Sequence, residues 1–180
     1  NSGYEIESLT VDGTDSSSAS TYSFTDVKAN HTITATMSPL TITITFNGNG
    51  SGVTSVPTAQ SGSYGTSITL SSTQPAQSNY TFRYWTFDSS GSGTTYAPGA
   101  SLTLPTSSRT LYAQWTINTY TLTYDGNGSN GGSAPVDANS PYNYNSTVTI
   151  ATNGTLTRTG YTFAGWNTLA NGTGTNYTSG

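Results

Sequence analysis

Aromatic side chains are the groups in this sequence with the clearest capacity to bind a ligand. The chain has 180 residues, among them 13 Tyr and 3 Trp. An indole or phenol ring offers a flat apolar face and a polar edge, which suits stacking against a sugar. Trp85, Trp115 and Trp166 could therefore form a carbohydrate-binding platform together with neighbouring tyrosines.

The same tryptophans lie within an internal repeat. Residues 31–50 match residues 109–128 in type nearly position by position, including the Gly-Asn-Gly that ends each segment. Residues 80–85 match residues 161–166 in the same way, after a short insertion in the later copy. A residue that recurs at one place in each unit of a repeat is more often an anchor of the fold than part of a site.

The repeat therefore assigns the tryptophans to a core. Trp85 and Trp166 occupy the same place in two units, and Trp115 aligns with the plain hydrophobe Met37. An aromatic side chain buries about 150–250 Å², so a few of them would dominate the core of a small module. We expect all three tryptophans to be structural.

Two tyrosines remain as candidates for contact with a ligand. Tyr142 and Tyr144 lie in the inserted region, where we find no close counterpart in the other units. The other tyrosines are expected to be structural or simply exposed. If the chain binds a glycan or a surface protein, Tyr142 and Tyr144 are the side chains expected at the contact.

The segment 125–129, Asp-Gly-Asn-Gly-Ser, carries oxygen-bearing side chains at alternate positions, as the start of a calcium-binding loop does. The remainder does not fit, because Asn130 stands where such a loop needs Gly and Val136 where it needs Glu. Asp, Asn and Gly also accept the backbone angles of tight turns. The sequence therefore predicts a hairpin turn here and no metal site.

Acidic residues cluster near the start of the chain, at Glu5, Glu7, Asp12 and Asp15. Alternating glutamates on a strand beside an Asp-Gly turn usually form a solvated face, with a weak metal site as the alternative. The single histidine, His31, has no partner pattern, and no pair of carboxylates recurs between units. Because an enzyme needs positioned acids, bases or nucleophiles, we expect no catalysis and no cofactor, and assign no catalytic, cofactor-binding or metal-ligating residue.

The composition excludes several classes of partner. Only 7% of residues are charged, the net charge is −4, and four basic residues cannot neutralise a phosphate backbone, so no nucleic acid is expected to bind. No apolar run approaches the roughly 18 residues of a membrane span, so no membrane insertion is expected in this segment. A chain without cysteine and rich in Thr, Ser and Gly is typical of bacterial or archaeal surface proteins, which predicts an extracellular, cell-surface location.

Alternating polar and apolar residues predict a mainly β fold with little or no helix. Residues 41–46 alternate strictly between Thr and an apolar side chain, and residues 119–124 do the same. One helical turn could fall within residues 53–60, although Pro57 opposes a longer helix. Further short strands are predicted at residues 33–37, 67–70, 102–104, 111–115 and 147–150.

The repeat divides the chain into three units that we expect to be arranged end to end. Residues 1–38 form the C-terminal part of a first unit and residues 39–117 a complete one. Residues 118–180 form a third unit, truncated before the strands equivalent to those from Leu102 to Trp115. Because the chain starts and stops within units, we expect it to be a piece of a longer protein.

Three sequence blocks carry a resemblance to a known family. They are Tyr-Thr-Leu-Thr-Tyr-Asp-Gly-Asn-Gly at 120–128, Gly-Tyr-Thr-Phe-Ala-Gly-Trp at 160–166 and Leu-Tyr-Ala-Gln-Trp at 111–115. Through them, residues 39–180 resemble the Listeria–Bacteroides repeats, the internalin B-repeat group of bacterial surface proteins. The middle unit departs from the pattern, with Asn79 and Tyr84 in place of the two glycines. The resemblance implies tandem small β-grasp-like modules that serve as a spacer or accessory binding segment without a catalytic centre.

Two functions from different classes are compatible with these observations. The first is a structural stalk, spacer or fibre of an extracellular surface protein, whose partners are the neighbouring repeats of the same chain. The second is an adhesive module that binds a glycan or a protein partner through Tyr142 and Tyr144. A variant of the first is a filament subunit joined to other copies by strand addition, because Thr-rich edges with few charges do little to block edge pairing.

Overall fold

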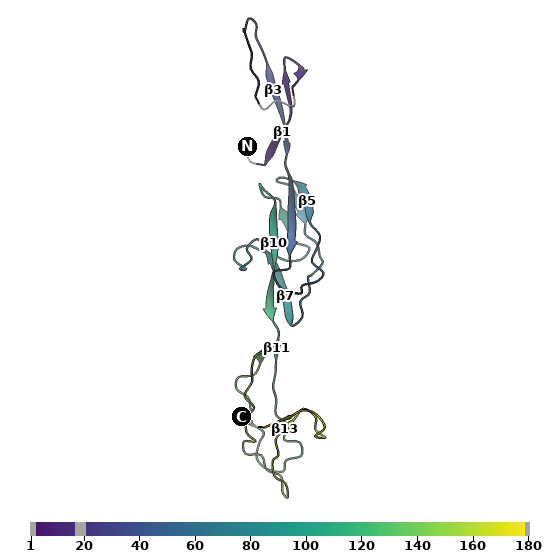
Figure 1. The fold of residues 1–180 in the computed structure, drawn as a ribbon, viewed down its shortest axis with the longest axis vertical. Coiled ribbons are helices and arrows are strands. Elements are labelled where there is room, and N and C mark those ends of the chain that lie inside the picture. Colours follow the sequence, from purple (N-terminus) through teal and green to yellow (C-terminus); the bar gives the residue numbers. More distant parts are fainter. Residues whose placement is uncertain (1–2, 17–20, 179–180) are drawn as a thin grey trace. The chain divides into compact units, whose positions relative to one another are not determined.

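A computed structural model describes residues 3–16 and 21–178 of the chain (Figure 1). The chain divides into two compact units, Asn1–Thr116 and Ile117–Gly180, called unit 1 and unit 2 below. Strands and irregular segments make up both units, and the described residues contain no helix. The mainly β fold predicted from the sequence is therefore confirmed.

Unit 1 begins with an antiparallel hairpin. β1 (Tyr4–Val11) pairs along its length with β3 (Ile33–Pro39), and the short β2 (Thr14–Asp15) pairs with the end of β1. The chain leaves β1 through Asp12 and Gly13, which have φ angles of 50° and 79°. Asp and Gly tolerate this left-handed region better than most residues, so the Asp-Gly pair fits the turn.

The carboxylate of Asp12 ties the ends of this hairpin together. Its Oδ1 accepts a hydrogen bond from the Thr32 N–H at 2.8 Å, and its Oδ2 lies 2.7 Å from Nδ1 of His31. Both contacts favour the ionised form, and the contact with His31 has the larger effect. The pKa of Asp12 is therefore lowered from its ordinary value of 3.8. The Phe24 ring stacks on His31 with centroids 4.2 Å apart, which holds the imidazole in place.

The rest of unit 1 is built around a five-stranded sheet with the order β5-β4-β10-β7-β8. Its strands are β4 (Thr41–Asn47), β5 (Gln60–Ser63), β7 (Tyr80–Thr86), β8 (Thr95–Tyr96) and β10 (Arg109–Ile117). β4 and β10 are parallel, with Leu111 opposite Phe46. β10, the last of these five strands in sequence, therefore lies at the centre of the sheet, beside β4, the first of them.

The core of unit 1 packs against one face of this sheet. Ile42 and Ile44 are buried and Phe46 is half-buried, as the alternation in β4 predicts. Trp85 is fully buried, with ring centroids 5.0 Å from Phe46 and 5.2 Å from Phe82. Its predicted role as a core anchor is confirmed.

A separate strand pair contributes the remaining side chains of the core. β6 (Ser67–Thr69) pairs antiparallel with β9 (Ser101–Thr103). Leu70, Leu102 and Leu104, in or next to these strands, belong to the same buried cluster as Trp85. The strand predictions for both segments are confirmed, and the pair provides a second wall for the core.

Trp115 is half-buried near the end of β10. Its ring lies 5.7 Å from that of Phe82, and its Nε1 donates a hydrogen bond to the carbonyl of Gly48 at 2.8 Å. Trp115 therefore closes one edge of the core and fastens the turn that follows β4.

Unit 2 contains only short strands. β11 (Thr119–Tyr120) pairs with β12 (Tyr142–Asn143), and β13 (Trp166–Asn167) pairs with β14 (Asn176–Tyr177). Each pair is antiparallel. The remainder of the unit consists of turns and irregular segments.

Three local predictions are wrong. The segment 119–124 is a strand only over its first two residues, and residues 147–150 form none. Their counterparts in unit 1 pair with β10 and β9, whereas no described residue of unit 2 takes those places. The helical turn predicted within residues 53–60 is absent, because Thr54 instead bridges Ala76 in an extended conformation.

The difference in burial between two equivalent tryptophans generates a prediction. Trp85→Ala removes a fully buried indole, and we expect it to lower the free energy of unfolding of unit 1 by about 3–5 kcal/mol. Trp166→Ala removes a half-buried indole and should destabilise unit 2 by less. Both effects can be measured by unfolding the variants in denaturant while hydrogen exchange monitors each unit separately. Equal losses of unfolding free energy in the two variants would contradict the prediction.

The Asp12 contacts generate a second prediction. The pKa of Asp12 in the folded state lies below 3.8, its value in the unfolded chain. The ionised carboxylate therefore stabilises the hairpin fully at pH values well above 3.8, and this stabilisation is lost as the pH falls through the folded-state pKa. The Thr32 amide resonance, titrated by NMR, should shift with a midpoint below 3.8. The transition should vanish in Asp12→Asn, and a midpoint at or above 3.8 would refute the assignment.

Candidate functional site

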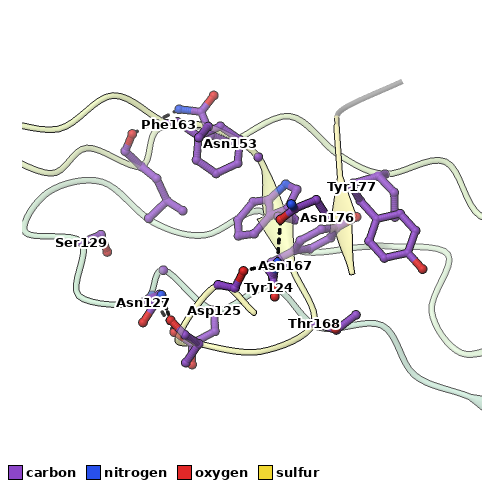
Figure 2. A pocket seen from close by; sticks show the side chains of 18 of the residues that line it. Tyr124, Asp125, Asn127, Ser129, Asn153, Phe163, Asn167, Thr168, Asn176 and Tyr177 are labelled. Atoms are coloured by element: carbon purple, nitrogen blue, oxygen red, sulfur yellow. Dashed lines mark hydrogen bonds between the residues drawn. The ribbon is translucent and has the colours of Figure 1, made fainter. Parts of the chain in front are cut away.

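Unit 2 is hollowed by a large open groove, called the unit 2 groove below (Figure 2). Its volume is about 1080 Å³, and all of its lining residues lie between Leu122 and Tyr177. Ligand pockets in proteins usually enclose about 300–1,000 Å³, so the groove is large for a small-molecule site.

One wall of the groove is aromatic. The Trp166 ring lies 4.7 Å from that of Tyr124 and 5.1 Å from that of Phe163, measured between centroids. The backbone of Ala151 holds two of these rings, since its carbonyl accepts from Trp166 Nε1 at 2.9 Å and its N–H donates to the Tyr124 hydroxyl at 2.9 Å. The wall is therefore fixed in position although it is open to solvent.

The side-chain amide of Asn167, which lines the groove, is fully used within the protein (Figure 2). Its Nδ2 donates to the carbonyl of Gly174 at 3.1 Å and to Oδ1 of Asn176 at 2.6 Å. Its Oδ1 accepts from the N–H groups of Leu169 at 2.9 Å and Gly174 at 3.0 Å. Asn167 therefore shapes the loop before β14, and it has little capacity left for a ligand.

The lining offers little for acid–base chemistry. Asp125 and Arg158 are the only charged residues among those that line the groove. The Asp125 carboxylate accepts the Asn127 N–H at 2.7 Å, and the Arg158 guanidinium lies over the Tyr161 ring at 4.3 Å. Both charges thus take part in local structure, and together they form no catalytic arrangement.

The segment 125–129 forms a turn, but no paired strands flank it, so the prediction of a hairpin turn is only partly met. Besides the contact between Asp125 and Asn127, the Ser129 N–H donates to the Gly126 carbonyl at 3.0 Å. Within residues 3–16 and 21–178, no three His, Cys, Asp or Glu side chains gather as they would around a metal ion.

The acidic residues near the start do not converge on one point. Glu5 and Glu7 are exposed or nearly so along β1, and Asp12 is engaged by His31 and Thr32. The pairing of His31 with Asp12 was not predicted from the sequence. The Asp12-Gly13 turn leads into β2, whereas His31 precedes β3 on the other side of β1, so no local pattern links the two residues.

Tyr144 has a counterpart in unit 1, which corrects the interpretation of the sequence. Its N–H donates to the Asn118 carbonyl at 2.8 Å, as the Tyr64 N–H donates to the Leu40 carbonyl at 2.9 Å. Tyr144 is therefore the equivalent of Tyr64, displaced by the insertion. Its side chain is 43% exposed and does not line the groove.

Tyr142 is half-buried, and it does not line the groove either. Its hydroxyl donates to Oδ2 of Asp137 at 2.7 Å, and this contact raises the pKa of Tyr142. The structure therefore does not bring Tyr142 and Tyr144 to the groove. The groove itself was not predicted from the sequence.

Two proteins of Evansella cellulosilytica are similar to parts of the chain. One, named "Putative Gly-rich membrane protein", is 38% identical over an alignment of 109 residues, and the match covers 58% of this chain and 12% of that protein. The other, named "Putative membrane protein", is 49% identical over 71 residues, which are 39% of this chain and 10% of that protein. The chain thus spans only a small part of the length of these relatives.

The family comparison gives a broader match. No solved structure matches the chain significantly, and no helix in the described part of the chain is long and apolar enough to cross a membrane. The profile of the Listeria-Bacteroides repeat domain matches residues 43–114 and again residues 120–180. Because these two successive matches cover more than half of its length, the chain belongs to the Listeria-Bacteroides repeat domain family.

Proposed function

We propose that the chain is a structural repeat segment, a stalk or spacer, of an extracellular cell-surface protein, and that it catalyses no reaction. The tandem repeat domains and the membrane-protein names of the two relatives support this function. So does the groove, whose lining residues form no catalytic arrangement. The chain has only four Lys and Arg residues, so as an exposed segment it presents few sites to trypsin-like proteases.

The observation that carries this proposal is the joint between the hairpin and the main sheet of unit 1. Leu40 alone separates β3 from β4. Its N–H donates to the Gly3 carbonyl at 2.9 Å, and its carbonyl accepts the Tyr64 N–H at 2.9 Å. Because both polar groups of the linking residue are paired, the connection resists rotation. A spacer needs connections that transmit orientation in this way.

Side chains reinforce the joint. The rings of Tyr4 and Tyr64 meet edge to face with centroids 5.5 Å apart. Gly3 lies against the Tyr64 ring so closely that a Cβ would overlap it, and its φ of +93° also favours glycine. The hairpin is thus fastened to the following module by main-chain hydrogen bonds and by aromatic packing.

An adhesive module is the second candidate, and the exposure of Tyr144 favours it. The ring is 43% exposed and lies outside the groove. An exposed phenol can stack on a sugar or enter a protein interface. In this alternative, Tyr144 and the neighbouring Tyr142 contact a glycan or a surface protein while the repeat supports them.

The stalk function predicts that the joint is stiff. Backbone NMR relaxation should give the same rotational correlation time for β1–β3 as for β4–β10 in the unaltered chain. Tyr64→Ala should shorten the correlation time of the hairpin, because it removes the packing on Tyr4 and Gly3. Tyr22→Ala, which removes an exposed tyrosine away from the joint, is the matched control. Independent motion of the hairpin in the unaltered chain would argue against a stiff spacer.

The adhesive alternative predicts a ligand that depends on Tyr144. Glycan-array binding should fall at least about tenfold in Tyr144→Ala, a change worth about 1.4 kcal/mol. Tyr22→Ala should bind as the unaltered chain does. Binding that is the same in all three proteins, or absent in all of them, would remove this alternative.

A further inference from the structure

A smaller pocket, called the unit 1 pocket below, lies in unit 1. Its volume is about 460 Å³, which falls within the roughly 300–1,000 Å³ that ligand sites usually enclose. All of its lining residues lie between Phe87 and Arg109. Its walls therefore come from the middle of the chain.

The loop between β7 and β8 forms one wall of the unit 1 pocket and is held in place by the protein. The Asp88 N–H donates to Oγ1 of the fully buried Thr86 at 3.1 Å, and the Gly91 N–H donates to the Asp88 carbonyl at 3.0 Å. Nδ2 of Asn49 donates to the Ser89 carbonyl at 2.9 Å. The loop is therefore ordered without a ligand.

Unit 2 contains the same loop frame. Nδ2 of Asn127 donates to the Ala170 carbonyl at 2.7 Å, as Asn49 does to that of Ser89. β13 pairs with β14 as β7 pairs with β8. The hydrogen bonds that shape the loop thus recur with the repeat and belong to the fold.

The side chains that this frame presents do not recur. In the alignment of the two loops, Phe87 and Asp88 correspond to Thr168 and Leu169. Arg109 corresponds to a histidine at the start of the repeated segment. Residues that anchor the fold recur in each unit of a repeat. The gathering of three residues that do not recur at one pocket therefore points to a role other than folding.

The floor of the unit 1 pocket is apolar. The rings of Phe87 and Tyr96 meet edge to face with centroids 5.5 Å apart. Leu102, which is buried, and Pro105, which is half-buried, complete this surface. A pyranose ring has a face of C–H groups that packs against a surface of this kind.

Two opposite charges line the same pocket. The Arg109 guanidinium lies over the Phe87 ring at 4.0 Å from its centroid, which orients it and leaves the N–H groups at its edge available to an acceptor. The Ser90 N–H donates to Oδ1 of Asp88 at 2.8 Å. Hydrogen bonds from the N–H and then the hydroxyl of Ser90 lower the pKa of Asp88 below 3.8, so this carboxylate is ionised at neutral pH.

The two charges do not neutralise each other. In the described part of the chain, Asp88 and Arg109 form no ion pair with each other or with another group. A ligand with a net charge meets a like charge on one side of the pocket. A sugar hydroxyl, in contrast, can donate to the carboxylate and accept from the guanidinium. The hydroxyls of Ser92, Thr94 and Thr103 add uncharged partners along the lining.

We propose that the unit 1 pocket binds one pyranose ring of a neutral glycan. The C–H face of the sugar packs on Tyr96 and Leu102, and its hydroxyls bridge Asp88 and Arg109. Both charged side chains are exposed, so water competes for these contacts and a single sugar binds with a millimolar dissociation constant. This binding is a property beyond the stalk function and does not depend on it.

The test titrates the full 180-residue chain with the methyl glycosides of glucose, galactose, mannose and N-acetylglucosamine, followed by NMR of the main-chain amides. At least one of these sugars should shift the amide resonances of residues 87–94 and 102–109. No shift from any of the four sugars at about 100 mM would overturn the proposal, since that concentration detects even millimolar binding. Shifts confined to other residues would overturn it as well.

Two variants test the charged groups. Asp88→Asn keeps an oxygen for the Ser90 N–H but removes the negative charge, and Arg109→Gln removes the guanidinium. Each should raise the dissociation constant of the sugar about tenfold, because each loses a hydrogen bond to a charged group. The amide spectrum outside the pocket should stay unchanged, which shows that each variant is folded.

Each variant has a matched control. Asp137→Asn changes a carboxylate that accepts the Asn139 N–H at 2.9 Å, in the same way that Asp88 accepts that of Ser90. Arg83→Gln removes a guanidinium that lies over the Tyr84 ring at 5.0 Å. Neither residue lines the unit 1 pocket, so both controls should bind the sugar as the unaltered chain does.

The signs of the two effects distinguish hydroxyl recognition from charge recognition. A site for an anion would bind more tightly in Asp88→Asn, and a site for a cation would bind more tightly in Arg109→Gln. Glucuronate and glucosamine serve as charged probes, and tighter binding of either than of the neutral sugars would refute the proposal. Tyr144→Ala, in unit 2, should leave this binding unchanged, which separates it from the adhesive alternative. The relaxation experiment tests the stalk function independently.

Discussion

The burial of β10 between β4 and β7 is the constraint on which the rest of unit 1 depends. This strand supplies Leu111 and Ala113 to the centre of the core, and burying one leucine-sized side chain is worth about 1.5–3 kcal/mol. Its neighbour β4 comes from the other end of the module in sequence, with Ile44 opposite Arg109. Such long-range pairing costs loop-closure entropy before the contacts that compensate for it can form. The core of unit 1 is therefore complete only when β10 has paired with β4.

Unit 2, in which no described residue takes the place of β10, shows the same dependence. Its Trp166 and Tyr124 lie in the same relation as Trp85 and Phe46 in unit 1, yet they are not buried to the same degree. Local sequence thus sets the arrangement of the rings, and the central strand determines whether water reaches them. This dependence also explains why residues 121–124 and 147–150 lack the strand structure that their alternation predicts.

Much of the fold was predictable from the sequence where burial on one face leaves a local pattern. Strict alternation identified β4 and the centre of β10, and the repeat identified Trp85 as part of the core. The tie between Gly3 and Tyr64 left no such pattern, because it joins residues far apart in the chain. The match of Tyr144 to Tyr64 was hidden by the insertion and emerged from a main-chain hydrogen bond.

The candidate site was less predictable than the fold. Nothing in the spacing of the residues indicated the groove of unit 2. Its aromatic wall is held by the Ala151 backbone, which contacts Trp166 and Tyr124, and Asn167 organises the loop before β14. These contacts depend on three-dimensional placement, so spacing along the chain could not reveal them.

The parallel pairing of β4 with β10 has a mechanical consequence. The chain enters the module at the start of β4 and leaves it at the end of β10, and parallel strands place these two points at opposite ends of the pair. A pulling force along the chain therefore loads the hydrogen bonds between the two strands in shear. Bonds loaded in shear must break together and not one after another, so the module should resist extension until it gives way in a single step.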